Sequence, residues 1–311
     1  MAKYRTSLPQ LLGGTFLADG GLETTLIFHE GVSLPHFASF VLLSYEDGRQ
    51  RLRSYYRPYL SLARNRGAGF ILDTPTWRAN PDWGAKLGYG PDALAEINKS
   101  AVGLMAELRN EFETPLAPCV ICVAIGPRGD GYKAGLMNAA EAEAYHGPQI
   151  AAAAASEADM AAAYTLTNVD EAIGIVRAAR EFSIPCAISF TLETDGRLVT
   201  GRTLRDAIET VDAATGGSAA YFMVNCAHPA HFSGTFEGGA WLSRILGVRA
   251  NASMKSHAEL DDSETLDEGD PEDLGRRYVL LKQALPSMRI FGGCCGTDHR
   301  HVAAICDAVR L

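Results

Sequence analysis

Short apolar runs alternate with longer amphipathic stretches along most of this chain. Each run has the length of a buried strand, and the stretches between the runs are long enough to form helices. Strands that alternate with helices in this way form βαβ units, whose strands lie parallel in one sheet. The predicted strands cover residues 16–18, 70–72, 117–125, 158–164, 187–190, 221–224, 248–252 and 289–291.

The number and spacing of these strands predict how the sheet closes. The clearest helical stretches cover residues 45–66, 92–112, 169–182 and 271–284. Eight strand–helix repeats in 311 residues fit a closed barrel better than an open doubly wound sheet. No linker or low-complexity segment divides the chain, so we predict an α/β fold with a single (β/α)8 TIM barrel domain over residues 1–311.

The composition restricts the classes of partner. The formal net charge is −9 and no basic run is present, which argues against nucleic acid and against an anionic membrane surface as partners. Nine acids and no bases lie between Glu259 and Asp273, which indicates a solvated loop and the start of a helix. No apolar stretch has the length of a signal-sequence core or a membrane span. Seven cysteines without a secretion signal favour a reducing compartment, so we expect a cytoplasmic protein.

The barrel prediction indicates where the chemistry should lie. In (β/α)8 barrels the functional side chains come from the carboxyl ends of the strands and from the loops that follow them. Three cysteines stand at such positions, because Cys226 follows the sixth strand and the pair Cys294 and Cys295 follows the eighth. Glycines on both sides of the pair permit the bend that lets adjacent side chains reach one ion. We therefore expect the three sulfur atoms to converge over the barrel mouth.

Three converging sulfurs predict a zinc (Zn2+) site. A lone cysteine at a strand end is usually an inert core residue, but three on one rim favour a soft metal ion. A vicinal disulfide between Cys294 and Cys295 is the alternative, which ring strain and a reducing compartment disfavour. His228, close in sequence to Cys226, is a reserve zinc ligand. The remaining cysteines are expected to be structural: Cys119, Cys122, Cys186 and Cys306.

Three thiolate ligands would leave one coordination position of the zinc ion open. A substrate thiol in that position would lose its proton and remain nucleophilic at neutral pH, where a free thiol is mostly protonated. This chemistry suits the transfer of an activated methyl group to sulfur. A lyase or hydrolase that works through metal-bound water is the alternative, but such enzymes ordinarily use histidine and carboxylate ligands.

Three motifs of the sequence resemble one enzyme family. They are DGGLET at residues 19–24, VNC at residues 224–226 and GGCCGT at residues 292–297. Their order and spacing are similar to those of the homocysteine S-methyltransferase family, and the likeness runs from about residue 17 to the end of the chain. The last motif is the most specific of the three.

The resemblance implies an activity and a set of partners. Members of this family are (β/α)8 barrels that hold zinc through the residues matching Cys226, Cys294 and Cys295, which makes these three the expected catalytic centre. They transfer a methyl group to homocysteine and so produce methionine. No cobalamin or folate module accompanies the barrel here, which implies a small donor such as S-methylmethionine, S-adenosylmethionine or betaine. A homo-oligomer is compatible with the sequence.

The resemblance also indicates which residues surround the acceptor. Asp19 and Gly20 match the family's loop that holds the amino-acid part of homocysteine, and Thr74 lies in the matching segment after the second strand. Asn225, a substrate-binding candidate next to a predicted zinc ligand, is expected either to orient that ligand or only to satisfy backbone groups of the loop.

The chain departs from the family at the end of the fourth strand. Family members place there a glutamate, followed by threonine, that binds the ammonium group of homocysteine, and Tyr164 stands in its place here. A phenol lacks the charge that an ammonium group favours. Either another acid compensates, for which Glu193 is the first candidate and Glu23 the second, or the acceptor is a different thiol. A non-catalytic relative that only binds thiols or metal is the remaining alternative.

Overall fold

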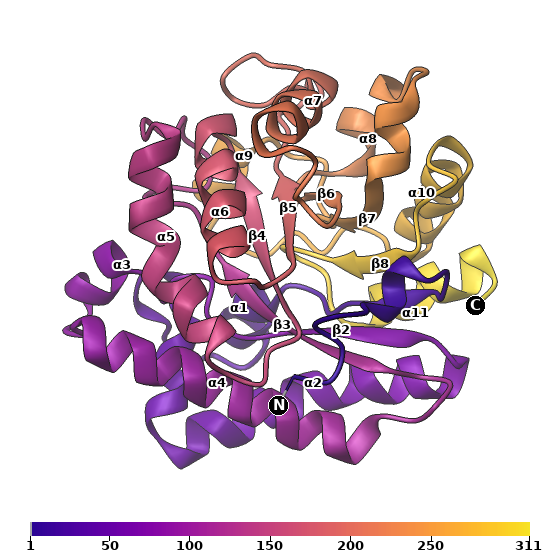
Figure 1. Cartoon of the computed structure of the whole chain (residues 1–311). Helices are drawn as coiled ribbons and strands as arrows, with labels where there is room; N and C mark the ends of the chain where they lie inside the picture. Colours follow the sequence, from indigo (N-terminus) through magenta and orange to yellow (C-terminus); the bar gives the residue numbers. More distant parts are fainter. Residues whose placement is uncertain (1) are drawn as a thin grey trace.

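Eight parallel strands close into a barrel in the computed structural model, which describes residues 2–311. Each strand pairs with the next along the chain, and β8 pairs with β1, so that every strand has two neighbours. Figure 1 shows the helices arranged around the outside of the strands. The predicted (β/α)8 barrel is confirmed. The strands are β1 (Phe16–Leu17), β2 (Gly69–Asp73), β3 (Cys119–Ile125), β4 (Met160–Leu166), β5 (Cys186–Phe190), β6 (Phe222–Asn225), β7 (Ile245–Ala250) and β8 (Ile290–Gly293).

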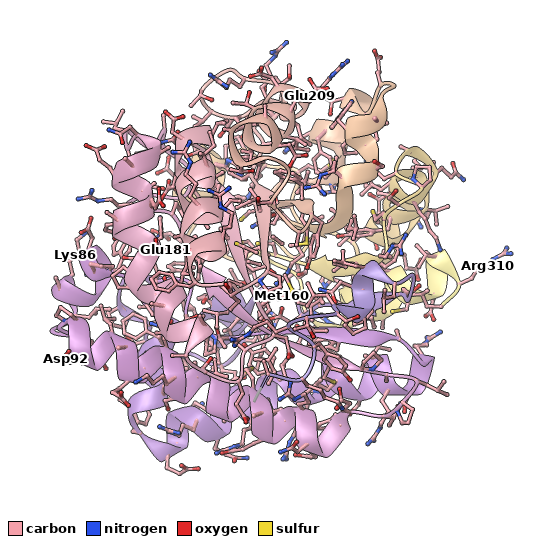
Figure 2. The ribbon with its side chains drawn as sticks, viewed as in Figure 1. Lys86, Asp92, Met160, Glu181, Glu209 and Arg310 are labelled. Atoms are coloured by element: carbon pink, nitrogen blue, oxygen red, sulfur yellow. The ribbon has the colours of Figure 1, made fainter. Side chains whose placement is uncertain are left out.

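Long helices cover the barrel, and side-chain caps fix where several of them begin. Asn138 accepts a hydrogen bond from the backbone N–H of Glu141 at the start of α5, and Thr203 caps α7 in the same way. Figure 2 shows the labelled charged residues Asp92 and Arg310 at the periphery and Met160 near the middle. The helices are α1 (Leu22–Thr24), α2 (Glu46–Arg66), α3 (Pro81–Lys86), α4 (Pro91–Phe112), α5 (Ala139–Ala154), α6 (Val169–Glu181), α7 (Leu204–Thr215), α8 (Pro229–Phe232), α9 (His257–Asp261), α10 (Pro271–Ala284) and α11 (His299–Val309). Shorter turns are a π-helical turn at Thr25–His29 and 3-10 turns at Pro9–Leu11, Pro35–Phe37, Ser39–Ser44, Ser233–Thr235 and Ala240–Arg244.

The strands separate two apolar clusters because successive side chains point to opposite faces. In β2, Phe70 and Leu72 belong to the cluster that also contains the helix residues, so that cluster lies between the strands and the helices. Ile71 belongs to a second cluster, composed mainly of strand residues, that fills the inside of the barrel. Cys119 and Cys122, three positions apart in β3, point to opposite faces and fall into different clusters.

The segment that precedes β1 closes the amino-terminal end of the barrel. Leu8 packs into the interior cluster, and the Arg5 guanidinium donates to the carbonyl oxygens of Ala154 and Ala158 at 2.7 and 2.6 Å. These contacts lie where β4 begins. The carboxyl ends of the strands are therefore the open side on which functional loops can gather.

Two strands are displaced by two or three residues at both ends from the ranges that the sequence predicted. The strand expected at 158–164 is Met160–Leu166, because a run of alanines contains no periodic signal that fixes its ends. The strand expected at 248–252 is Ile245–Ala250, since a 3-10 turn ends at Arg244 and the strand follows it directly. Within residues 2–311, none of the helices combines the length and the apolar character needed to cross a bilayer.

Close packing between α5 and α6 yields the first testable prediction. A Cβ atom at Gly174 in α6 would lie 2.5 Å from the Ala139 carbonyl oxygen and 2.6 Å from the Glu143 backbone nitrogen, both in α5. Gly174→Ala should therefore lower the free energy of unfolding by about 1–3 kcal/mol, measured by chemical denaturation. Gly103→Ala is the matched control, because a Cβ at this exposed position in α4 meets nothing within 4 Å. The control should raise stability by about 0.5–1 kcal/mol, and equal effects of the two variants would contradict the packing argument.

Candidate metal centre at the barrel mouth

Three cysteine thiols meet above the carboxyl ends of β6 and β8. Cys226 directly follows β6, and Cys294 and Cys295 directly follow β8. Their sulfur atoms all lie within 4.8 Å of one another, and those of Cys226 and Cys295 are 3.6 Å apart. The thiols are free, so no disulfide joins the adjacent pair. The convergence expected from the sequence is present, and the role of these residues as metal ligands stays a prediction.

The backbone around the thiols adopts conformations that direct them toward one another. Cys226 has a φ of 57°, in the left-handed region that residues other than glycine seldom adopt. Gly296, with a φ of 77°, ends the turn that follows the cysteine pair. A Cβ atom at Gly21, in the loop after β1, would lie only 2.6 Å from the carbonyl oxygen of Cys294. The glycine-containing loops after β1 and β8 therefore pack directly against each other.

Asn225 connects the end of β6 to the ends of β4 and β5. Its side-chain oxygen accepts hydrogen bonds from the Ser189 hydroxyl at 2.6 Å and from the Thr165 backbone N–H at 2.8 Å. Its amide nitrogen donates to the Thr165 hydroxyl at 2.9 Å and lies 3.9 Å from the sulfur of Cys294. Thr165 is itself left-handed, with a φ of 61°. These bonds fix the strand ends beside the thiols, as expected of a residue that orients a ligand.

A tyrosine from the loop after β3 covers the thiols. The Tyr132 hydroxyl lies 3.1 Å from the Cys226 sulfur and 3.9 Å from the Cys295 sulfur. The Tyr132 ring stacks on His257, with ring centroids 4.1 Å apart and planes 14° apart. The His257 Nε2 is 2.7 Å from the Cys226 carbonyl oxygen, and its Nδ1 is 3.0 Å from a Glu193 oxygen. Sequence reasoning missed both aromatic residues because neither lies in a motif or at a strand end.

A buried arginine joins two acids within the barrel mouth. Arg249 in β7 donates from Nη1 to Asp73 at 2.5 Å and from Nη2 to Asp19. The Tyr164 hydroxyl donates to both carboxylate oxygens of Asp73 at 3.0 Å, and the Tyr55 hydroxyl donates to Asp19 at 3.0 Å. All five side chains are buried. The arginine was also missed, although a charged residue inside an apolar strand run is a signal that the sequence contains.

Burial and charge pairing act in opposite directions in this cluster. Burial raises the pKa of Asp19 to about 7 and also raises the pKa of Asp73, while Arg249 opposes both shifts. Burial disfavours the Arg249 charge, but the two carboxylates hold its pKa above the ordinary value. Hydrogen bonds from Cys226 and Cys295 hold the pKa of the Cys294 thiol well below its ordinary value. The positive charge of Arg249 thus favours the ionised forms of Asp19, Asp73 and Cys294.

Most of the expected substrate residues make internal contacts in this structure. Asp19 and Tyr164 belong to the arginine cluster, and the Gly20 carbonyl oxygen lies 3.4 Å from Arg249 Nη2. Thr74 is buried, and its hydroxyl is 2.6 Å from that of Thr76. The structure therefore brings these residues to the barrel mouth, but it leaves their binding of a substrate as a prediction.

His228 does not join the three thiols. The group of metal-ligating atoms found there contains the cysteines without a histidine. The His228 ring instead accepts the backbone N–H of Ala230 at 3.2 Å and so caps α8, and burial lowers its pKa to about 4. The expectation of a reserve zinc ligand is corrected, because the ring is used as a helix cap.

The donor set fits a soft divalent ion. Zinc–sulfur bonds of about 2.3 Å in a tetrahedron place the sulfur atoms about 3.8 Å apart. The separation of 3.6 Å between Cys226 and Cys295 is close to that value. Among residues 2–311, three cysteines supply the metal-ligating atoms of this group, and neither a histidine nor a carboxylate joins them. Such a set leaves one position of a tetrahedral ion for a substrate atom.

Comparison with known proteins adds the family to this geometry. The family model described as homocysteine S-methyltransferase matches residues 16–309. The chain belongs to this family. It is therefore a methyltransferase, and the match includes the loops that hold the three cysteines.

Two crystal structures of the homocysteine methyltransferase MmuM from Escherichia coli have the same fold. The oxidized form has a TM-score of 0.72 at 20% sequence identity and covers 94% of each chain. The metallated form has a TM-score of 0.72 at 19% identity, covering 96% of this chain and 98% of MmuM. A search of curated protein sequences found no match.

The arginine cluster yields the second prediction. Arg249→Met would leave Asp19 and Asp73 buried without their cation, which should lower the free energy of unfolding by about 3–5 kcal/mol. Arg57→Met removes the cation of the exposed Arg57–Glu111 pair and should cost at most about 1 kcal/mol. Chemical denaturation of both variants measures the difference.

The loss caused by Arg249→Met should also depend on pH. Burial raises the native pKa of Asp19 to about 7, above its ordinary value of 3.8, so the native state holds more protons than the unfolded state between these pH values. The contribution of Asp19 to the free energy of unfolding therefore falls as pH rises through this window. Removal of the Arg249 charge raises the pKa of Asp19 further and makes this fall steeper. The free energy of unfolding lost in Arg249→Met should therefore be larger at pH 8 than at pH 5. A loss that is equal or smaller at pH 8 would contradict the assignment of Arg249 as the partner of these acids.

Proposed function

We propose that this methyltransferase is zinc-dependent and transfers a methyl group from a small sulfonium or ammonium donor to a thiol acceptor. The observation that supports this proposal most directly is the meeting of three sulfur atoms within 4.8 Å of one another at the barrel mouth. Cys226, Cys294 and Cys295 would hold the ion. A zinc ion with three thiolate ligands supplies the deprotonation of an acceptor thiol and keeps it nucleophilic at neutral pH. We propose that residues 1–311 act as one domain.

The surrounding residues supply positions rather than a general base. Asn225 fixes the strand ends on which Cys226 and Thr165 adopt left-handed backbone conformations. Tyr132 lies over the Cys226 and Cys295 sulfurs, so its side chain would border a thiol held there. In the transfer, the acceptor sulfur forms a bond to the methyl carbon while the bond from that carbon to the donor sulfur or nitrogen breaks. The thiol proton leaves to solvent, and the donor departs as a neutral thioether or amine.

Homocysteine is the first candidate acceptor, because the family model bears its name and MmuM is a homocysteine methyltransferase. A second candidate is a thiol that lacks an ammonium group. Three acids of the barrel mouth are already paired: Asp19 and Asp73 with Arg249, and Glu193 with His257. Tyr164, which replaces the family's ammonium-binding glutamate, donates its hydroxyl to Asp73 rather than offering a charge. We therefore propose that an ammonium group contributes little to the binding of the acceptor.

The third prediction tests the metal ligands. The purified protein should retain about one zinc ion per chain and methylate a thiol, and Cys226→Ala or Cys295→Ala should abolish both properties. Replacing a residue that only hydrogen-bonds to a metal ligand typically weakens metal binding by about 10–100-fold, and removal of a ligand itself should weaken zinc binding by more than this. Cys306→Ala is the matched control, because Cys306 is a buried cysteine in α11, outside the sulfur cluster. A zinc-free preparation with full activity would rule out the proposal, and zinc binding without any methylated product would favour the non-catalytic relative.

The fourth prediction tests the acceptor. Homocysteine and 4-mercaptobutyrate differ only by the ammonium group, so their kcat/KM values with one sulfonium donor should agree within about threefold, well below the tenfold that 1.4 kcal/mol of differential binding would produce. The comparison uses product formation followed by mass spectrometry. A preference for homocysteine of a hundredfold or more would show that a free acid recognises the ammonium group. In that case Glu23 would be the first residue to replace, because no cation lies within ion-pair distance of it among residues 2–311.

A further inference from the structure

Arg78 contacts the loop that covers the candidate metal centre, and part of its hydrogen-bonding capacity is unused. It follows β2, and its guanidinium lies 4.2 Å from the ring centroid of Trp77 and 4.0 Å from that of Trp83. Its Nη1 donates to the carbonyl oxygen of Gly129 at 2.7 Å. Its Nε is buried without a hydrogen-bond partner among residues 2–311, and Nη2 makes no hydrogen bond to them either.

The unused donors form one edge of the guanidinium group. The N–H groups of Nε and Nη2 point in the same direction, and this pair matches the two oxygens of a carboxylate. Buried N–H groups are rarely left without a partner in folded proteins, so an orphaned one requires an explanation. The two tryptophans fix the plane of the group and Gly129 holds its far side. The free edge of Arg78 is therefore already oriented for a planar anion.

Contacts of Trp77 connect this arginine to the barrel mouth. The Trp77 indole N–H donates to the Tyr164 carbonyl oxygen in β4 at 3.3 Å. A Cβ at Gly131 would lie 3.4 Å from the Trp77 ring, so the chain passes directly over that ring. The next residue is Tyr132, whose hydroxyl contacts the Cys226 sulfur at 3.1 Å. Arg78 and the Cys226 sulfur thus contact the same loop, the first at Gly129 and the second at Tyr132.

The charges around the mouth leave Arg78 as a cation without a paired acid. No carboxylate of residues 2–311 lies within 4.0 Å of its nitrogen atoms. Asp130 and Glu23 are near enough to raise its pKa, but Asp130 pairs with Lys133 at 3.4 Å and the Glu23 carboxylate accepts the Ser39 hydroxyl at 2.7 Å. Burial lowers the pKa of Arg78 only to about 10, so the group keeps its charge at neutral pH. The acids of the arginine cluster, by contrast, are already paired.

We propose that Arg78 binds the carboxylate group of a substrate through its Nε–Nη2 edge. The inference rests on the proposed function, because the same ligand must present its reacting sulfur to the thiol cluster. The carboxylate belongs either to the acceptor thiol or to a sulfonium donor. In both cases the ligand is a short carbon chain with sulfur at one end and a carboxylate at the other.

Thiol binding in the absence of a donor tests the acceptor as the source. Zinc-loaded protein is titrated by calorimetry with 4-mercaptobutyrate and with propane-1-thiol, which differ only by the carboxylate. Hydrogen bonds to a charged group correspond to about 10–150-fold in affinity, so 4-mercaptobutyrate should bind at least tenfold more tightly. Arg78→Gln should remove this preference and leave the affinity for propane-1-thiol unchanged within about twofold, as expected when one charge-assisted contact is lost.

Two further variants separate binding from general damage. Arg78→Lys keeps the charge but loses the two-pronged edge, so it should recover only part of the preference for the carboxylate. Arg128→Gln removes a nearby arginine that is already paired with Asp82 and should leave both affinities unchanged. Zinc content and thermal melting of each variant show whether the fold and the metal centre are intact.

A titration with the donor tests the other source. S-methylmethionine carries a carboxylate and trimethylsulfonium does not, so an Arg78→Gln effect confined to S-methylmethionine assigns the carboxylate to the donor. An effect on either the acceptor or the donor supports the proposal. If neither carboxylate-bearing ligand loses affinity in Arg78→Gln while thiols still bind, this inference is overturned and the proposed function stands. If the zinc-loaded protein binds no thiol of either kind, the proposed function fails and this inference fails with it.

Discussion

The site depends on the closure of the parallel sheet between β1 and β8. Only two residues of β1 pair with β8, Phe16 with Ile290 and Leu17 with Phe291. This seam makes the first and last segments of the sequence neighbours, and it packs the loop after β1 against the loop that contains Cys294. In a closed parallel barrel all strands end on the same side, so β6 and β8 deliver their cysteines to one rim. Pairing of β6 and β8 with β7 brings the three sulfur atoms together, and closure adds the loop after β1, which packs against Cys294.

The barrel mouth combines two kinds of polar layer above an apolar interior. The inward side chains lower in the barrel, such as Val120 and Met160, are apolar. Above them, Arg249 binds two acids in a place where an unpaired charge would be strongly unfavourable. The thiols form the layer nearest the loops. This order explains why acids that the sequence offers as substrate ligands are instead part of the structure, and why recognition of a substrate falls to groups on the rim such as Arg78.

The sequence was informative where function depends on position along a strand and less so where it depends on side chains from distant elements. The glycine-flanked cysteine pair and Cys226 could be placed on one rim, because strand ends in a barrel share a side. Tyr132 and His257 could not be found in this way, since their contact with the thiols depends on how two loops fold over the mouth. Asp19 was correctly placed near the site, but its pairing with Arg249 spans 230 positions of the chain. No local sequence pattern predicts such a contact, although an arginine within a buried strand indicates that an acid must lie nearby.

The central claim is that three cysteine sulfurs of one rim hold a zinc ion whose remaining position is taken by the sulfur of the acceptor. X-ray absorption spectroscopy at the zinc edge, with and without the acceptor thiol, tests this claim most directly. We expect three sulfur ligands and one lighter ligand in the protein alone, and four sulfur ligands once the thiol is added. A zinc ion bound mainly by nitrogen and oxygen, or a sulfur count that the thiol does not change, would contradict it.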